Sequence, residues 1–223
     1  MKKTGLYVFA FLVILIPWIY LLMAWSQMAE TVPTHFGLDG EPDDFGSKAS
    51  VLLLPLGMIT ITGIGIFLLL MNIHRIDPKR QHNSPELVAR IGLGILIFMA
   101  VIGVLIVDSA RSGALHFDKI LLPLMGFFFA FLGSTFTSLK PNYFIGLRTP
   151  WALEDDNNWQ YTHKLAAKYW MAGGLLAAVI SLFLPFETSF IVFFVIILLI
   201  AGIPFYCSYR FYKRTKAHKL KSK

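Results

Sequence analysis

The sequence has little charge and almost no cysteine. Of its 223 residues, 15% are charged and 56% are hydrophobic, whereas a soluble domain is usually about 25% charged and about 45–50% apolar. The one cysteine, Cys207, lies in an apolar run, which excludes a disulfide within the chain and predicts a small buried hydrophobe. These shortages argue against a soluble or disulfide-stapled domain.

The apolar residues gather in six runs of about 20 residues, the length that crosses about 30 Å of hydrocarbon as an α-helix. The runs cover approximately residues 5–25, 51–71, 89–108, 120–139, 166–186 and 188–208. A β-barrel would instead alternate in polarity over about ten residues. The sequence therefore predicts an all-α polytopic membrane protein with about six transmembrane helices. The first run resembles a signal peptide, but its length and the poor cleavage site at Ala24-Trp25-Ser26 favour a retained helix.

Basic residues are distributed unevenly between the polar segments. When these segments are numbered alternately from the N-terminus, 17 of the 20 Lys and Arg residues fall in one set, and only Lys48, Arg111 and Lys119 fall in the other. The positive-inside rule then predicts that the N- and C-termini are both cytoplasmic. The net charge of +7 is explained by this asymmetry, so no direct nucleic-acid binding is expected. The basic tail 211–223 suits anionic headgroups, with docking of a protein partner as the alternative.

The first outer segment, residues 26–50, is acidic and rich in Gly and Pro. His35, Asp39, Asp43 and Asp44 are its candidate contacts. Such a composition is typical of a turn-rich loop, and it also suits a surface that binds a partner. A metal site is a third interpretation, but the spacing fits neither an EF-hand nor a zinc site, so we expect no metal and no cofactor.

A dense polar segment, residues 140–165, interrupts the apolar runs on the predicted cytoplasmic side. Pro141 should end a helix, Gly146 allows a turn, and the acids from Glu154 to Asp156 should begin the next helix. Trp159, His163 and Trp170 then recur on one helical face. His163 could act as a general base, but a hydrogen-bonding anchor is favoured because no nucleophile or catalytic motif accompanies it. We therefore expect no enzyme.

Transport is the main alternative function to consider. Transporters usually carry ionisable groups inside their spans or paired broken helices. The six runs contain almost no ionisable groups, and Asp108 lies at a helix end. Pro55, Pro123 and Pro204 all lie near span ends, where a proline disturbs a helix little. A small-molecule or lipid-handling transporter remains the alternative.

The polar segment resembles the hallmark of a known family. The motif runs from Lys140-Pro141-Asn142-Tyr143-Phe144-Ile145-Gly146-Leu147-Arg148 through Thr149-Pro150-Trp151 to Trp159 and His163. It is similar to that of the SdpI family, bacterial membrane immunity proteins that act against a secreted sporulation-delaying peptide. The outer segment PTHFGLDGEPDDFGSK resembles a second module, of unassigned function, that is often found at the N-terminus of longer members. Ser134 and Asn158 depart from the usual family pattern.

The resemblance implies a location and two activities. The location is the bacterial cytoplasmic membrane. One activity is protection from a peptide toxin, and the other is signalling in which an ArsR-type repressor is held at the membrane. It also suggests an N-terminal module at 1–88, an SdpI-like membrane domain at 89–210 and the tail at 211–223. We expect these motif residues to couple the membrane helices to a cytoplasmic partner: Pro141, Asn142, Gly146, Arg148, Thr149, Pro150, Trp151, Trp159 and His163. A purely structural role for the motif is equally open.

Overall fold

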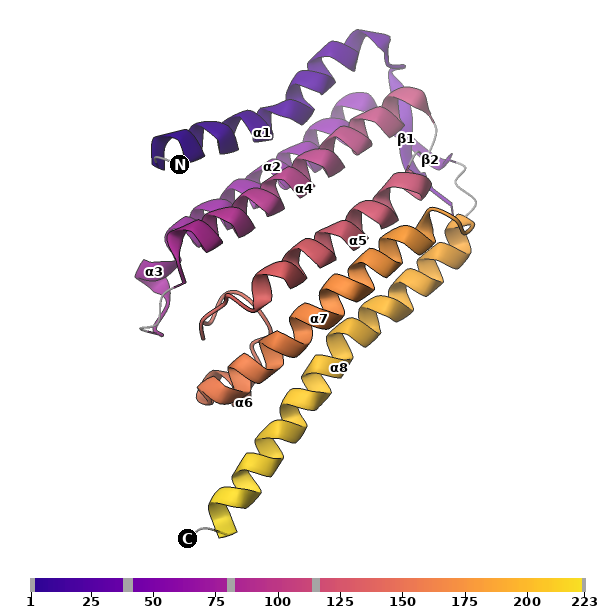
Figure 1. Cartoon of the computed structure of the whole chain (residues 1–223). Coiled ribbons are helices and arrows are strands. Elements are labelled where there is room, and N and C mark those ends of the chain that lie inside the picture. The colour runs from indigo at the N-terminus through magenta and orange to yellow at the C-terminus, as the bar shows by residue number, and fades with distance from the viewer. Residues whose placement is uncertain (1–2, 38–41, 80–82, 114–116, 222–223) are drawn as a thin grey trace.

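The protein is a bundle of long helices with one small β-hairpin (Figure 1). The computed structural model describes residues 3–37, 42–79, 83–113 and 117–221. The long helices are α1 (Lys3–Ala24), α2 (Lys48–Met71), α4 (Pro85–Ser112), α5 (Phe117–Phe136), α7 (Asp156–Ser181) and α8 (Phe186–Lys221). Short elements are η1 (Trp25–Gln27), β1 (Thr31–Phe36), β2 (Pro42–Ser47), α3 (Ile73–Ile76) and α6 (Pro150–Glu154). The all-α membrane architecture is confirmed, with the hairpin as its exception.

Among the described residues, five helices are long and apolar enough to cross a membrane, and α7 is not one of them. The sequence predicts a sixth span at 166–186, whereas α7 covers Asp156–Ser181. Helix α7 carries Lys164 and Lys168 around the start of that run and ends at Ser181, so the apolar stretch within it is short. In Figure 1, α7 lies between α5 and α8 and connects the two ends of the bundle.

The helices form two groups along the chain. Helix α4 packs mainly on α1 and α2, whereas α7 packs mainly on α5 and α8, and α4 meets α5 over a smaller surface. Both termini lie at the same end of the bundle as α3 and α6, and the hairpin lies at the other end (Figure 1). The polar segments thus lie at alternate ends of the bundle, which agrees with the uneven distribution of basic residues. Which end is cytoplasmic stays a prediction. The domain boundaries at 88 and 210 also stay predictions.

Helices α5 and α7 approach each other closely enough to bring their backbones into contact. A Cβ added to Gly174 would lie 2.6 Å from the backbone N of Ala130 and 2.6 Å from the carbonyl O of Gly126. A Cβ on Gly133 would lie 2.7 Å from the N of Met171. Small residues permit such contact between membrane helices, where van der Waals packing drives association. This contact holds the segment between α5 and α7 in place.

The predicted helix boundaries around the polar segments are largely confirmed. Ser84 caps α4, its Oγ accepting a hydrogen bond from the Leu87 N–H at 3.2 Å, and Pro85 follows as the first helical residue. Asp155 caps α7 by accepting from the N–H groups of Asn157 and Asn158. Helix α5 ends at Phe136, before Pro141. A short turn then makes α7 and α8 an antiparallel hairpin.

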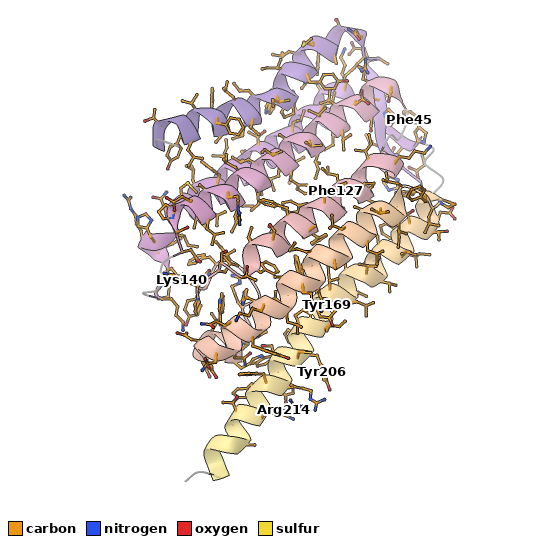
Figure 2. All side chains as sticks on the ribbon, viewed as in Figure 1. Phe45, Phe127, Lys140, Tyr169, Tyr206 and Arg214 are labelled. Carbon is orange, nitrogen blue, oxygen red and sulfur yellow. The ribbon has the colours of Figure 1, made fainter. Side chains whose placement is uncertain are left out.

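Helix α8 continues far beyond the apolar run at 188–208. It is helical to Lys221 and projects past the other helices (Figure 1), with Arg214 on the projecting part (Figure 2). Basic side chains lie over tyrosine rings one turn back: Lys213 Nζ is 4.9 Å from the Tyr209 ring centre, and Lys216 Nζ is 5.8 Å from that of Tyr212. These cation–π contacts support the helix as it leaves the bundle.

Candidate functional site

Asn142 organises the loop between α5 and α6. Its side chain is fully buried. The Oδ1 atom accepts hydrogen bonds from the backbone N–H groups of Phe144 and Ile145 at 2.9 and 2.7 Å, while Nδ2 donates to the carbonyls of Lys140 and Ile145. One side chain thus replaces the hydrogen bonds that a regular element would supply. Pro141, also buried, precedes it.

Gly146 and His163 fit directly against each other. Gly146 has φ = 99°, and a Cβ at this position would lie 2.3 Å from His163 Nε2. The next residue, Leu147, donates its backbone N–H to the same Nε2 at 3.2 Å. Only glycine combines this backbone conformation with so close an approach. The motif glycine is therefore explained by the histidine 17 residues later.

Trp159 and His163 stack one turn apart at the start of α7, with ring centres 4.0 Å apart. Trp159 is fully buried and its Nε1 donates to the carbonyl of Leu139 at 2.8 Å, which holds the end of the α5 segment against α7. Phe136 packs edge-on against His163. The predicted face is confirmed, and Trp170 extends it through its contact with Phe136.

His163 is held as a neutral imidazole. Its Nδ1 lies 2.9 Å from the carbonyl O of Trp159 and must donate there, so Nε2 is the acceptor for Leu147. His163 lies ahead of the apolar run at 166–186, and burial lowers its pKa to about 4, opposed by the hydrogen bond to Trp159. A buried, doubly bonded and neutral His is a hydrogen-bonding anchor, as the sequence favoured over a general base.

Arg148 and Tyr143 form the exposed part of the motif. Arg148 donates through Nη1 to the carbonyl O of Tyr143 at 2.6 Å, and its side chain is otherwise exposed. The Tyr143 side chain is 45% exposed. These two side chains are therefore available to a partner, whereas Asn142, Trp159 and His163 are not.

Thr149, Pro150 and Trp151 build α6 and attach it to α8. Thr149 Oγ1 accepts from the N–H of Ala152 at 3.3 Å as the N-cap, and Pro150 occupies the first helical position. Trp151 donates through Nε1 to Ser208 Oγ at 2.8 Å. Its ring packs between Phe205 and Tyr209 of α8, with ring centres 5.4 and 5.2 Å away.

Ser208 is the centre of a buried polar network that sequence reasoning missed. Besides Trp151, its Oγ contacts Thr162 Oγ1 at 2.7 Å and Asn158 Oδ1 at 2.9 Å, and its carbonyl accepts from Asn158 Nδ2 at 3.2 Å. Ser208, Asn158 and Thr162 are all fully buried. The network joins α6, α7 and α8. The SdpI-family pattern usually has an apolar residue at the position of Asn158. Here the polar amide is accommodated because it has hydrogen-bond partners on α8.

The motif is also tied to the segment between α3 and α4. Asn83 Oδ1 accepts from the backbone N–H of Lys140 at 2.8 Å, and Lys79 Nζ donates to the carbonyl of Leu153. Both bonds connect the helix group α1, α2 and α4 with the motif. Lys140 marks this end of the bundle in Figure 2, opposite Phe45 of the hairpin.

An apolar groove of about 430 Å³ lies beside the motif loop, between the two helix groups. Its walls come from α2, α4 and α5, and include Leu70, Ile91 and Phe136. The motif contributes Ile145 and Gly146, and α7 contributes Trp170. Trp170 Nε1 is buried without a hydrogen-bond partner, a costly state for a polar group in an apolar setting.

The acidic segment forms the hairpin β1–β2, where the sequence predicted only a turn-rich loop. The strands are antiparallel, with Thr31 opposite Ser47 and Val32 opposite Gly46. Val32, 1% exposed, packs with residues of α2 and α4. Lys48, 7% exposed, pairs with Glu30 at 2.9 Å and lies 4.9 Å from the centre of the Trp25 ring. These contacts fix the hairpin to the bundle.

The outer candidate residues are exposed on this hairpin. His35 Nδ1 and Asp43 Oδ1 lie 2.6 Å apart, with side chains 69% and 54% exposed. Asp44 accepts from the N–H of Phe45, a residue that is 57% exposed. Asp39 lies outside the described residues. Within the described ranges, no group of three or more His, Cys, Asp or Glu side chains could hold a metal ion.

The structure thus gathers the motif residues at one end of the bundle and the acidic residues at the other. Two family models match these parts of the chain. The SdpI/YfhL protein family matches residues 138–208, which contain the motif and the Ser208 network, and a domain of unknown function, DUF1648, matches residues 12–59, which contain the hairpin. The similarity to the SdpI/YfhL protein family thus lies in the part of the chain that carries the motif. The resemblance drawn from the motif and the outer segment is confirmed.

Two curated relatives differ in how much of the chain they match. The Immunity protein SdpI of Bacillus subtilis (strain 168) is 22% identical over 214 residues, covering 96% of this chain and 98% of that protein. An uncharacterized protein of Archaeoglobus fulgidus is 60% identical over 38 residues, covering 17% of this chain and 21% of that protein. No solved structure matches the chain significantly.

Proposed function

We propose that this chain protects the cell that carries it from a secreted antimicrobial peptide. The observation that carries the proposal is the end-to-end match to an immunity protein, which includes both the N-terminal helices and the motif. The membrane location follows from the helices. We expect the bacterial cytoplasmic membrane to be the site of action.

The hairpin is the proposed contact for the peptide. It presents the carboxylates of Asp43 and Asp44 beside the exposed ring of Phe45. A cationic, amphipathic peptide suits such a surface, since opposite charge speeds encounter and an exposed aromatic ring offers apolar contact. At the predicted orientation, this end of the bundle faces away from the cytoplasm.

The same proposal gives the motif the task of coupling. The hairpin packs on α2 and α4. At the other end of the bundle, the segment that connects these two helices binds the motif through Lys79 and Asn83. A shift of α2 or α4 would therefore reach the motif loop through two hydrogen bonds. Arg148 and Tyr143 are the exposed groups through which a cytoplasmic protein would sense it.

Signalling through an ArsR-type repressor is the finer form of this proposal. The family resemblance motivates it, and the exposed Arg148 and the projecting basic end of α8 provide surface for a partner. The expected result is that a repressor encoded beside this gene moves to the membrane only when the peptide and this protein are both present. Localisation of a fluorescently labelled repressor measures it.

A transporter is the second candidate, and the groove beside the motif is the observation that favours it. Against it, Asp108 near the end of α4 is already engaged: it accepts from Tyr20 at 2.7 Å and from Arg111 at 2.9 Å. Uptake of a small molecule or lipid by proteoliposomes would support the transporter.

The first test is survival of a peptide-sensitive bacterium that expresses this chain. Wild type should protect against the sporulation-delaying peptide or a candidate peptide encoded nearby. The double variant Asp43→Asn/Asp44→Asn should weaken protection by about tenfold in peptide concentration, since exposed charge pairs contribute about 0.2–1 kcal/mol each. The loss should be greatest at low ionic strength.

The matched control is Glu86→Gln, which removes an exposed acid at the other end of the bundle. It should protect as wild type does, and immunoblots of membranes must show equal amounts of all variants. Arg148→Ala tests the motif in the same assay. Failure of a well-expressed wild type to protect against either peptide would contradict the proposed function, and full protection by both variants would contradict the assigned residues.

A further inference from the structure

A second pocket lies between α1, α2, α3 and α4 at the end of the bundle that carries the termini. Its volume is about 350 Å³, within the range of about 300–1,000 Å³ of sites that hold small molecules. It is separate from the groove beside the motif, although Leu70 borders both.

The walls of this pocket are apolar and its rim is polar. Leu6, Leu70, Met71 and Val88 supply hydrocarbon surface. Tyr7 lies at the side, 43% exposed, with its ring packed edge-on against Phe67.

The rim carries positive charge and hydrogen-bond donors. Arg75 and His74 are exposed on α3, and Asn72 and Asn83 lie beside them. No acid is among the described residues that line the pocket. Within the described ranges, Arg75 forms no ion pair.

We propose that this pocket binds an anionic phospholipid, with the phosphate at Arg75 and the start of an acyl chain against Leu6, Met71 and Val88. The guanidinium fork suits a phosphate because it offers two parallel N–H donors. Basic pockets between membrane helices on the cytoplasmic side suit such headgroups, and the bilayer supplies the ligand at this depth.

The bound lipid would also reach the motif. Asn83 uses its Oδ1 to hold the N–H of Lys140, and its Nδ2 remains for the headgroup. Lipid binding would therefore stiffen the connection between α4 and the motif loop. Lipid binding at this pocket does not require the peptide. A test of the lipid site is therefore independent of a test of the proposed immunity function.

Native mass spectrometry of the purified full-length protein tests the site. Wild type, titrated with phosphatidylglycerol or phosphatidylcholine, should retain the anionic lipid more tightly. Arg75→Gln should weaken retention of phosphatidylglycerol about five- to tenfold and leave phosphatidylcholine unchanged, since a basic residue near headgroups contributes about 1 kcal/mol or more. Glycerol 3-phosphate, which lacks acyl chains, should not displace the lipid.

Arg90→Gln is the matched control, because Arg90 is exposed on α4 and does not line the pocket. Leu6→Trp fills the apolar part without changing charge and should weaken both lipids, which keeps the test decisive if Arg75→Gln fails to fold. Equal retention of the two lipids by wild type would overturn the proposal. So would an equal loss in Arg75→Gln and Arg90→Gln, which would indicate general surface attraction.

Discussion

At the scale of single residues, Gly146 shows how a backbone conformation and a close contact can require the same residue. Gly146→Ala should lower the free energy of unfolding by about 1–3 kcal/mol, because the strained φ and the approach to His163 Nε2 both oppose a Cβ. Thermal unfolding in detergent measures it. Gly202→Ala is the control: nothing lies within 4 Å of its position, so stability should stay or rise. An unchanged melting temperature for Gly146→Ala would contradict this account.

His163 should make stability depend on pH. Its pKa is about 4 when folded and 6.5 when unfolded, so the unfolded state binds more protons between these values. Stability should therefore be steady above about pH 6.5 and fall towards pH 4, by a few kcal/mol at most. His163→Gln should flatten this part of the curve of melting temperature against pH, whereas His74→Gln, at an exposed position, should not. A steep curve that survives in His163→Gln would assign the effect to other groups.

At the scale of elements, the Ser208 network binds three helices with one hydroxyl. Ser208→Ala removes the acceptor for Trp151 and the donor to Asn158, and should destabilise the fold by about 1–3 kcal/mol because buried partners are left unsatisfied. Ser134→Ala is the control, since that exposed hydroxyl bonds only to a carbonyl of its own helix. Denaturation followed by tryptophan fluorescence compares them. Equal midpoints would mean that aromatic packing alone holds α6 to α8.

Elements differ in how far the sequence predicts them. The spans follow from apolar runs near 20 residues, and the caps at Ser84 and Asp155 from local hydrogen bonding, both of which are properties of neighbouring residues. The hairpin was missed because its strands lack alternation: Val32 is its buried anchor, and Pro33 and Pro42 stand within the strands. Ser208 was missed because a single serine in an apolar run has no periodic signal. Its role exists only once α7 lies beside α8.

At the scale of the whole molecule, the motif connects helices through its buried residues and exposes one charged side chain to solvent. Its buried members, Asn142, Trp159 and His163, bond to the chain itself, which explains the motif structurally. Arg148 alone among the predicted coupling residues keeps an exposed side chain with hydrogen-bonding capacity to spare. The contacts of the buried residues therefore favour a structural role for them, and a coupling role is left for Arg148. The survival assay of Arg148→Ala tests that coupling role.

Helix α8 has a length that the bilayer cannot accommodate. Its 36 residues span about 54 Å, against about 30 Å of hydrocarbon. Counter-ions screen charge over about 8 Å at physiological ionic strength. This distance is short compared with the length by which α8 exceeds the hydrocarbon thickness. Only the basic residues at the root of the projection therefore feel the headgroups. Farther along the projecting part, Lys216 is exposed, and at the predicted orientation it would reach the aqueous phase, where its charge would attract negatively charged molecules that approach the membrane.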